Sequence, residues 1–196
     1  MNKKSQITIY ILLGLILLIS FSFISYLNNG SVKQSGIEKS AELLFDISPI
    51  RMYTENCIEN TGKSALIYIG KQGGYYELKK PYLMDDIFKL PYYLYQYLDF
   101  SPSINTIEQE ISKYIDDNLH LCINNFKELE EQGFDVEHNI AKSNAKIAAN
   151  SVSISLNFPV TIIKGNQIKR IENFNAILYN IHLKNIHNLS KEIVKL

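Results

Sequence analysis

The sequence predicts an α+β protein: an N-terminal transmembrane helix followed by an extracytoplasmic domain of two amphipathic helices, a small antiparallel sheet and a C-terminal helix. Three observations support this fold class. Residues 7–27 form an apolar run without a single charge. Apolar residues recur every three or four positions in residues 48–71 and 103–132, as on one face of a helix. Apolar and polar residues alternate in residues 152–158, as in a half-buried strand.

The apolar run has the length of a membrane-spanning helix. At about 1.5 Å per residue it reaches roughly 30 Å, the thickness of a bilayer's hydrocarbon core. Lys3 and Lys4 precede it, so the positive-inside rule places the short N-terminal end in the cytoplasm. A cleaved secretory signal would have a shorter apolar region. We therefore expect a single-pass protein of the cell membrane, with cytoplasmic residues 1–6, transmembrane helix 7–27, juxtamembrane linker or helix 28–47 and extracytoplasmic domain 48–196.

A second interpretation of the N-terminus comes from residues 4–10, Lys-Ser-Gln-Ile-Thr-Ile-Tyr. They resemble the archaeal class III (type IV pilin-like) signal, in which a basic residue and Gly precede Gln-x-Ser-x-Glu and a hydrophobic helix. Gln6 matches and Thr8 stands near the family's Ser, whereas Ser5 replaces the Gly and Tyr10 replaces the Glu. The resemblance implies cleavage between Ser5 and Gln6 and packing of the helix into a filament.

More broadly, the chain resembles uncharacterised single-pass surface proteins of small-genome archaea. Those proteins open similarly and carry a Cys-containing helix followed by Gln-Gly-Gly-Tyr, which here is residues 72–75. This resemblance implies a place at the cell surface and no known activity.

Charge and composition limit the possible partners. Lys and Arg together number 20, as do Asp and Glu, so the chain has no net charge to attract nucleic acid. Basic residues do not cluster with aromatic ones as in a nucleic-acid groove. Residues 48–196 amount to one domain. We expect a membrane contact through residues 7–27, another surface or membrane protein as partner, and no cofactor.

Turn signals and spacing define the helices of the domain. The helix of residues 48–71 can be capped by Ser48 and ended by Gly73-Gly74, which is expected to lead into a strand. The helix of residues 103–132 is ended by Gly133, and its polar face is expected to be solvated.

The two cysteines, Cys57 and Cys122, lie on the apolar stripes of these two helices. If the stripes pack together, the thiols can meet, and an exported domain lies on the oxidising side of the membrane. We therefore predict a Cys57–Cys122 disulfide, with two free buried thiols as the alternative.

Tyrosine is unusually abundant, with 13 Tyr and no Trp, and it gathers in residues 75–100. Such rings can cover the domain's own core, or they can form a contact surface of large area at low entropic cost. The candidate interaction surface consists of Tyr75, Tyr76, Tyr92, Tyr93, Tyr95 and Tyr97.

The last third predicts a hairpin and a helix. Pro159 is expected to end or edge the strand that begins at residue 152, and residues 160–163 continue it. Gly165-Asn166 then makes the turn into residues 168–174. Residues 136–148 can add a strand before the hairpin, and residues 176–196 have the spacing of an amphipathic helix.

No motif for catalysis or metal binding is present in the sequence. His120 is two residues from Cys122, on another helical face, and His182 and His187 are five apart, which is not a helical ligand pair. Asn29 and Asn188 begin possible glycosylation sequons.

The sequence therefore predicts a membrane-anchored binding or assembly protein that is not an enzyme. Two alternatives stay open: a pilin-like subunit processed before Gln6, and an extracytoplasmic hydrolase whose site is assembled from scattered residues.

Overall fold

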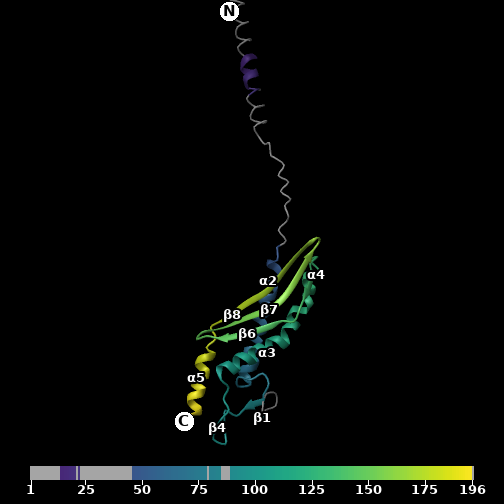
Figure 1. Ribbon diagram of the computed structural model, residues 1–196. Coiled ribbons are helices and arrows are strands. Elements are labelled where there is room, and N and C mark those ends of the chain that lie inside the picture. The colour runs from purple at the N-terminus through teal and green to yellow at the C-terminus, as the bar shows by residue number, and fades with distance from the viewer. Residues whose placement is uncertain (1–13, 21, 23–45, 79, 85–88, 196) are drawn as a thin grey trace, which may run out of the picture. The chain divides into compact units, whose positions relative to one another are not determined.

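The computed structural model describes residues 14–20, 22, 46–78, 80–84 and 89–195. The chain divides into two compact units, Met1–Leu44 and Phe45–Leu196, and all the strands among the described residues lie in the second. That unit is α+β (Figure 1), with two helices on one side of a four-stranded antiparallel sheet.

The predicted fold class needs one correction. Within the described ranges, no helix is both long enough and apolar enough to cross a bilayer. Of the predicted transmembrane segment 7–27, the structure describes residues 14–20 and 22, which are helical. The described fold is α+β, and the transmembrane helix is withdrawn from the fold class.

The sheet is built around one long central strand, β7 (Ser151–Lys164). Strand β8 (Gln167–Tyr179) pairs with one side of β7, as the predicted hairpin requires. On the other side β5 (Asp135–His138) pairs with the C-terminal half of β7, and β6 (Lys142–Ile147) pairs with its N-terminal half. All pairs are antiparallel, and alternate residues of β7 are buried from Val152 to Ile162. One face of the sheet therefore carries the core, and the other carries Ser, Asn and Lys side chains.

Pro159 lies inside β7, not at its end. The register between β7 and β8 shifts between Asn157 and Val160, which is the site of a β-bulge. Proline has no N–H to donate to a ladder, so a bulge is one of the few places where a strand accepts it. The Pro159 carbonyl accepts a hydrogen bond from the Asn139 N–H, 3.0 Å away, where β5 gives way to β6. Pro159 thus marks an irregularity within the strand, and residues 160–163 continue it as predicted.

Two helices cover the apolar face of the sheet. Helix α2 (Ser48–Lys71) packs mainly on β8, and α3 (Ile104–Ile123) packs on β6 and alongside α2. The predicted disulfide joins them: Cys57 and Cys122 are bonded, with Cα atoms 5.5 Å apart and a sequence separation of 65. Closing a loop of that length contributes roughly 4 kcal/mol in the chain-entropy description.

The C-terminal end of α2 is set by the residues expected, whereas its start is not. Ser48 does not cap the helix; instead the Asp46 carboxylate accepts from the Ser48 N–H at 2.9 Å. The predicted stop at Gly73-Gly74 is confirmed. Both glycines have positive φ (61° and 94°), and the Gly74 N–H donates to the Ile69 carbonyl. A Cβ on Gly74 would lie 2.9 Å from Pro102, so the chain turns here in close contact with the start of α3.

The single helix predicted for residues 103–132 is broken. Helix α3 ends at Ile123, a 3-10 turn (η1, Asn124–Phe126) follows, and a short helix α4 (Lys127–Glu130) completes the segment. Asn124, Asn125 and Phe126 all have left-handed φ values. Asparagine tolerates that conformation better than most residues, and Phe126 is held there because its ring is fully buried.

The remaining elements differ from the prediction. Residues 75–78 do not form a strand; the first strands are two short hairpins, β1 (Tyr82–Met84) with β2 (Lys89–Pro91), and β3 (Leu94–Tyr95) with β4 (Leu98–Asp99). The C-terminal helix α5 spans Leu183–Val194, because residues 176–179 belong to β8. None of its residues is buried.

Gly62 allows α2 to approach the sheet closely. A Cβ at this position would lie 2.4 Å from Cδ1 of Ile154, which is 1% exposed. We expect Gly62→Ala to lower the free energy of unfolding by about 1–2 kcal/mol, because overpacking exceeds the gain in helix propensity of about 1 kcal/mol. Urea unfolding measures this change in the free energy of unfolding. Gly70→Ala in the same helix is the control, since its Cβ meets nothing within 4 Å and should stabilise. Equal effects of the two changes would contradict this account.

Candidate functional site

The six tyrosines of the candidate surface separate into two groups in the structure. Tyr75, Tyr76 and Tyr93 hold the domain together. The Tyr75 hydroxyl donates to the Phe100 carbonyl at 3.0 Å, and the Tyr93 hydroxyl donates to the Gly73 carbonyl at 2.6 Å. Burial raises the pKa of both phenols above the usual value. These contacts anchor the β3–β4 hairpin to the glycine stop of α2.

Tyr76 belongs to a ring cluster on the helices. Its ring lies edge-on to Tyr68 and Tyr114, with centroids 5.8 Å and 5.1 Å away. Its backbone N–H and that of Glu77 donate to the Glu110 carboxylate, at 2.7 Å and 2.9 Å. Tyr76 therefore packs against the domain's own core, which is the first of the two roles expected for these rings.

The other three tyrosines, Tyr92, Tyr95 and Tyr97, are exposed, and they define the surface that we call the tyrosine hairpin (residues 92–99). At its tip Gln96 and Tyr97 have φ values of 51° and 64°. The Tyr97 side chain is 99% exposed, so its ring touches almost nothing of this chain. Leu94 and Leu98 on the two strands are also more than half exposed. The hairpin thus presents aromatic and aliphatic side chains to the solvent.

The neighbouring hairpin adds to this apolar character. Leu83, Met84 and Leu90 on β1 and β2 are exposed as well. Figure 1 shows β1 and β4 at the same end of the domain. Monomeric proteins seldom gather exposed apolar side chains in this way unless a contact covers them.

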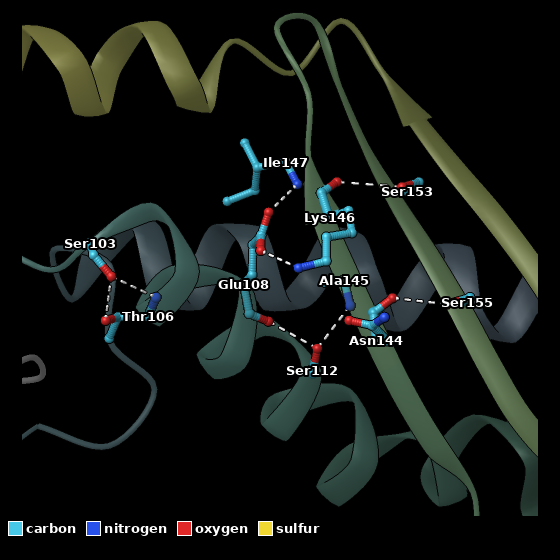
Figure 2. A network of polar contacts seen from close by, with 10 residues as sticks. All are labelled: Ser103, Thr106, Glu108, Ser112, Asn144, Ala145, Lys146, Ile147, Ser153 and Ser155. Atoms are coloured by element: carbon cyan, nitrogen blue, oxygen red, sulfur yellow. Dashed lines mark hydrogen bonds and ion pairs between the residues drawn. The ribbon is translucent and has the colours of Figure 1, made fainter.

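A second candidate site lies between α3 and strand β6, and it was missed in the sequence. Glu108, Ser112 and Asp116 follow one another at intervals of four residues on α3, so they share a face. Each accepts one backbone N–H from β6: Glu108 from Ile147 at 2.9 Å, Ser112 from Ala145 at 2.9 Å, and Asp116 from Ser143 at 2.6 Å. Figure 2 shows the first two of these bonds. We call these three contacts the edge clamp.

Lysines complete the edge clamp. The Lys146 Nζ atom lies 2.8 Å from the second carboxylate oxygen of Glu108 (Figure 2). The Lys142 Nζ atom lies 2.8 Å from the second carboxylate oxygen of Asp116. The Asp116 carboxylate raises the pKa of Lys142. Although a groove of about 600 Å³ lies over these residues, each carboxylate oxygen already accepts a hydrogen bond. The edge clamp therefore covers the outer edge of the sheet. The polar face of α3, which was expected to be solvated, contacts β6 instead.

Helix α5 is held by polar contacts. The His187 Nε2 atom lies 2.8 Å from the Pro102 carbonyl oxygen, and Lys191 Nζ lies 2.6 Å from the Asp99 carboxylate and 2.8 Å from the Ser101 hydroxyl. We call these contacts the α5 strut. Ile186, Leu189 and Ile193 of α5 are each about 60% exposed.

Other predicted site residues are dispersed. Asn188 is exposed on α5, while Asn29, Ser5 and Gln6 lie outside the described residues, so glycosylation at Asn29 and processing before Gln6 stay predictions. Among the residues that the structure describes, no three His, Cys, Asp or Glu side chains are placed to share a metal ion. His138 packs its ring near Phe126 and Phe158.

Comparison of the chain with protein-family profiles, with curated proteins and with solved structures finds no match. Its function is therefore argued from these surfaces alone.

We expect Glu108→Ala to open the edge of β6. The substitution leaves the buried Ile147 N–H without an acceptor, which costs about 1–3 kcal/mol. Native-state hydrogen exchange should show faster exchange at Ile147 than in the parent protein. Gln109→Ala, which alters an exposed neighbour on the same helix, is the control and should leave that amide protected. Unchanged protection at Ile147 in Glu108→Ala would show that the clamp does not hold the strand.

The α5 strut should resist acid. Hydrogen bonds from Lys191 and then Ser101 lower the pKa of Asp99 below its ordinary value of 3.8. Because the folded pKa is depressed, the strut is fully present above pH 3.8 and is lost only as pH falls through the lower folded value. NMR titration of the Asp99 carboxyl should show this, and Lys191→Met should move the midpoint upward. A midpoint at the ordinary value in the parent protein would refute the contact.

Proposed function

We propose that the domain is a protein-binding module that works outside the reducing cytoplasm, with the tyrosine hairpin as its contact surface. The observation that carries this proposal is Tyr97, an aromatic residue at a left-handed turn position with a side chain that is 99% exposed.

The conformation of Tyr97 is unfavourable for its own chain. Two-residue hairpin turns with positive φ at both positions are usually made by Asn-Gly or similar pairs, because a Cβ crowds the backbone there. Gln96 and Tyr97 accept that strain, and the Tyr97 ring gains no burial in return. Strain of this kind gathers at binding and catalytic sites. Contact of the Tyr97 ring with another molecule would explain why an aromatic residue occupies the tip of the hairpin.

The hairpin is also fixed in position. The Phe100 N–H donates to the Tyr93 carbonyl at 2.8 Å, and the Tyr93 hydroxyl ties the base to Gly73. A contact surface that is already ordered loses less conformational entropy on binding. Tyrosine is enriched in such surfaces because it offers large area with few rotatable bonds.

Chemistry already described supports the proposed compartment and partner. The Cys57–Cys122 disulfide supports an oxidising environment, since cytosolic thiols are kept reduced. Exposed Leu94, Tyr97 and Leu98 suit an interface with an apolar centre, and the partner that we propose is another surface protein. The filament-subunit and hydrolase alternatives stay predictions.

A pair of glycine substitutions tests the proposal. Tyr97→Gly and Gln96→Gly each relieve the strained turn, so both should raise the free energy of unfolding by about 0.5–1 kcal/mol. Only Tyr97→Gly removes the ring. A photo-cross-linking residue at position 98, in cells that make the protein, should give a discrete protein adduct in the parent and in Gln96→Gly, and lose it in Tyr97→Gly. An adduct that survives Tyr97→Gly, or a loss of stability in that variant, would exclude this role for the ring.

A further inference from the structure

Strand β8 forms the second edge of the sheet, opposite the edge that the edge clamp covers. Among the described strands, β8 pairs with β7 alone, along a length of 13 residues. The free side of an edge strand offers a row of backbone N–H and C=O groups, which an extended polypeptide strand satisfies. The chemistry of this edge therefore specifies a further strand as its partner.

The register of the sheet shows which backbone groups face the open side. The Ala148 N–H donates to the Ser151 carbonyl at 2.9 Å, so the backbone groups of Ser151 face β6. Successive residues of a strand turn these groups to opposite sides, so Val152 faces β8 and its partner Leu178 faces β7. The same alternation turns three exposed residues of β8 toward the open side, each with one donor and one acceptor: Asn175, Ile177 and Tyr179.

The open segment of β8 has a defined length. Before it, the Asn173 carbonyl accepts a hydrogen bond from Arg51 Nη1 of α2 at 3.3 Å, and residues 169–172 include charged side chains. After it, Asn180 has a φ of 60° and the strand has ended. Residues 174–179 between these limits, Phe-Asn-Ala-Ile-Leu-Tyr, contain no charge, no Pro and no Gly. This composition is typical of segments that pair with copies of themselves.

We propose that β8 pairs antiparallel with β8 of a second copy of this chain, with the two Ile177 residues facing each other on a two-fold axis. In this register Asn175 lies opposite Tyr179 of the second copy, and each facing pair exchanges two N–H···O=C bonds. The register matches residues of equal orientation, so the buried faces of both sheets lie on the same side. The two four-stranded sheets then form one continuous sheet.

Two features favour a second copy over an unrelated strand. The residues that face the open side are placed symmetrically about Ile177, so an antiparallel copy pairs with the segment along its full length. Lys and Arg number 20, as do Asp and Glu, so no net charge repels the copies. Ile177, which is 47% exposed, is covered by its counterpart in the dimer. The tyrosine hairpin takes no part in this contact, so the inference stands apart from the proposed function.

Cysteine cross-linking tests the register. In a hydrogen-bonded antiparallel pair the Cα atoms lie about 5.5 Å apart, within the range for a disulfide. In cells that make the full-length protein, Ile177→Cys should therefore give a covalent dimer on a non-reducing gel. Ile168→Cys is the matched control, because Ile168 is on the same strand and 68% exposed but lies far from its counterpart in this register; it should stay monomeric.

A charge at the same position tests the contact without an added cysteine. Ile177→Lys places like charges opposite each other and should raise the dimer dissociation constant roughly ten-fold in sedimentation equilibrium of the full-length protein. Ser155→Lys adds the same charge to the same face of the sheet, on β7 between Asn144 and Asn175, and should leave the constant unchanged. Both positions are at least half-exposed, and circular dichroism checks that both variants fold.

Three results would overturn the proposal. The first is equal dimer formation by Ile177→Cys and Ile168→Cys, which would show random collision. The second is a mixed disulfide of Ile177→Cys with a different protein and no homodimer, which would give the edge to an unrelated strand. The third is a parent protein that is monomeric, or that associates no more tightly than Ile177→Lys.

Discussion

The edge clamp between α3 and β6 is the constraint on which the arrangement of the domain depends. A strand at the edge of a sheet leaves alternate backbone N–H groups without partners, and such edges invite pairing with other chains. Here Asp116, Ser112 and Glu108 replace the missing strand, one N–H each. Because α3 must lie along β6 to do this, and the disulfide fixes α2 beside α3, the positions of both helices over the sheet follow from one row of acceptors.

Much of the architecture could be predicted from the sequence, because it depends on local periodicity. The alternation in β7, the helical spacing of α2 and the placement of Cys57 and Cys122 on facing stripes are all visible in the chain. The break after Ile123 was hidden, since Phe126 and Leu129 continue the apolar spacing on either side of a left-handed turn. The signal that could have revealed the clamp was also present: three acceptors four residues apart, on a face that was interpreted as solvated.

The candidate surfaces were less predictable for a physical reason. Whether a tyrosine stabilises the domain or is free to contact a partner depends on which groups its hydroxyl can reach. The hydrogen-bond partners of Tyr75 and Tyr93 are carbonyls 25 and 20 residues away in sequence. The composition singles out the six tyrosines as a group, but it does not separate those that hold the domain together from those that are exposed. The contact of His187 likewise depends on Pro102, which lies 85 residues earlier and leaves no trace in the spacing of the histidines. The apolar run near the N-terminus falls largely outside the described residues, so its role rests on sequence alone.

The way in which α5 is attached has a consequence for how the domain unfolds. The four-stranded sheet and helices α2 and α3 share one buried core, so they should unfold together in a single cooperative event. Helix α5 contributes no buried residue to that core. Among its side chains Leu183 alone, partly buried, packs against that core. We therefore expect α5 to be a unit of lower local stability, which opens more often than the folded layers. Protease cutting at residues 180–182 would release a short peptide and leave the rest of the fold intact.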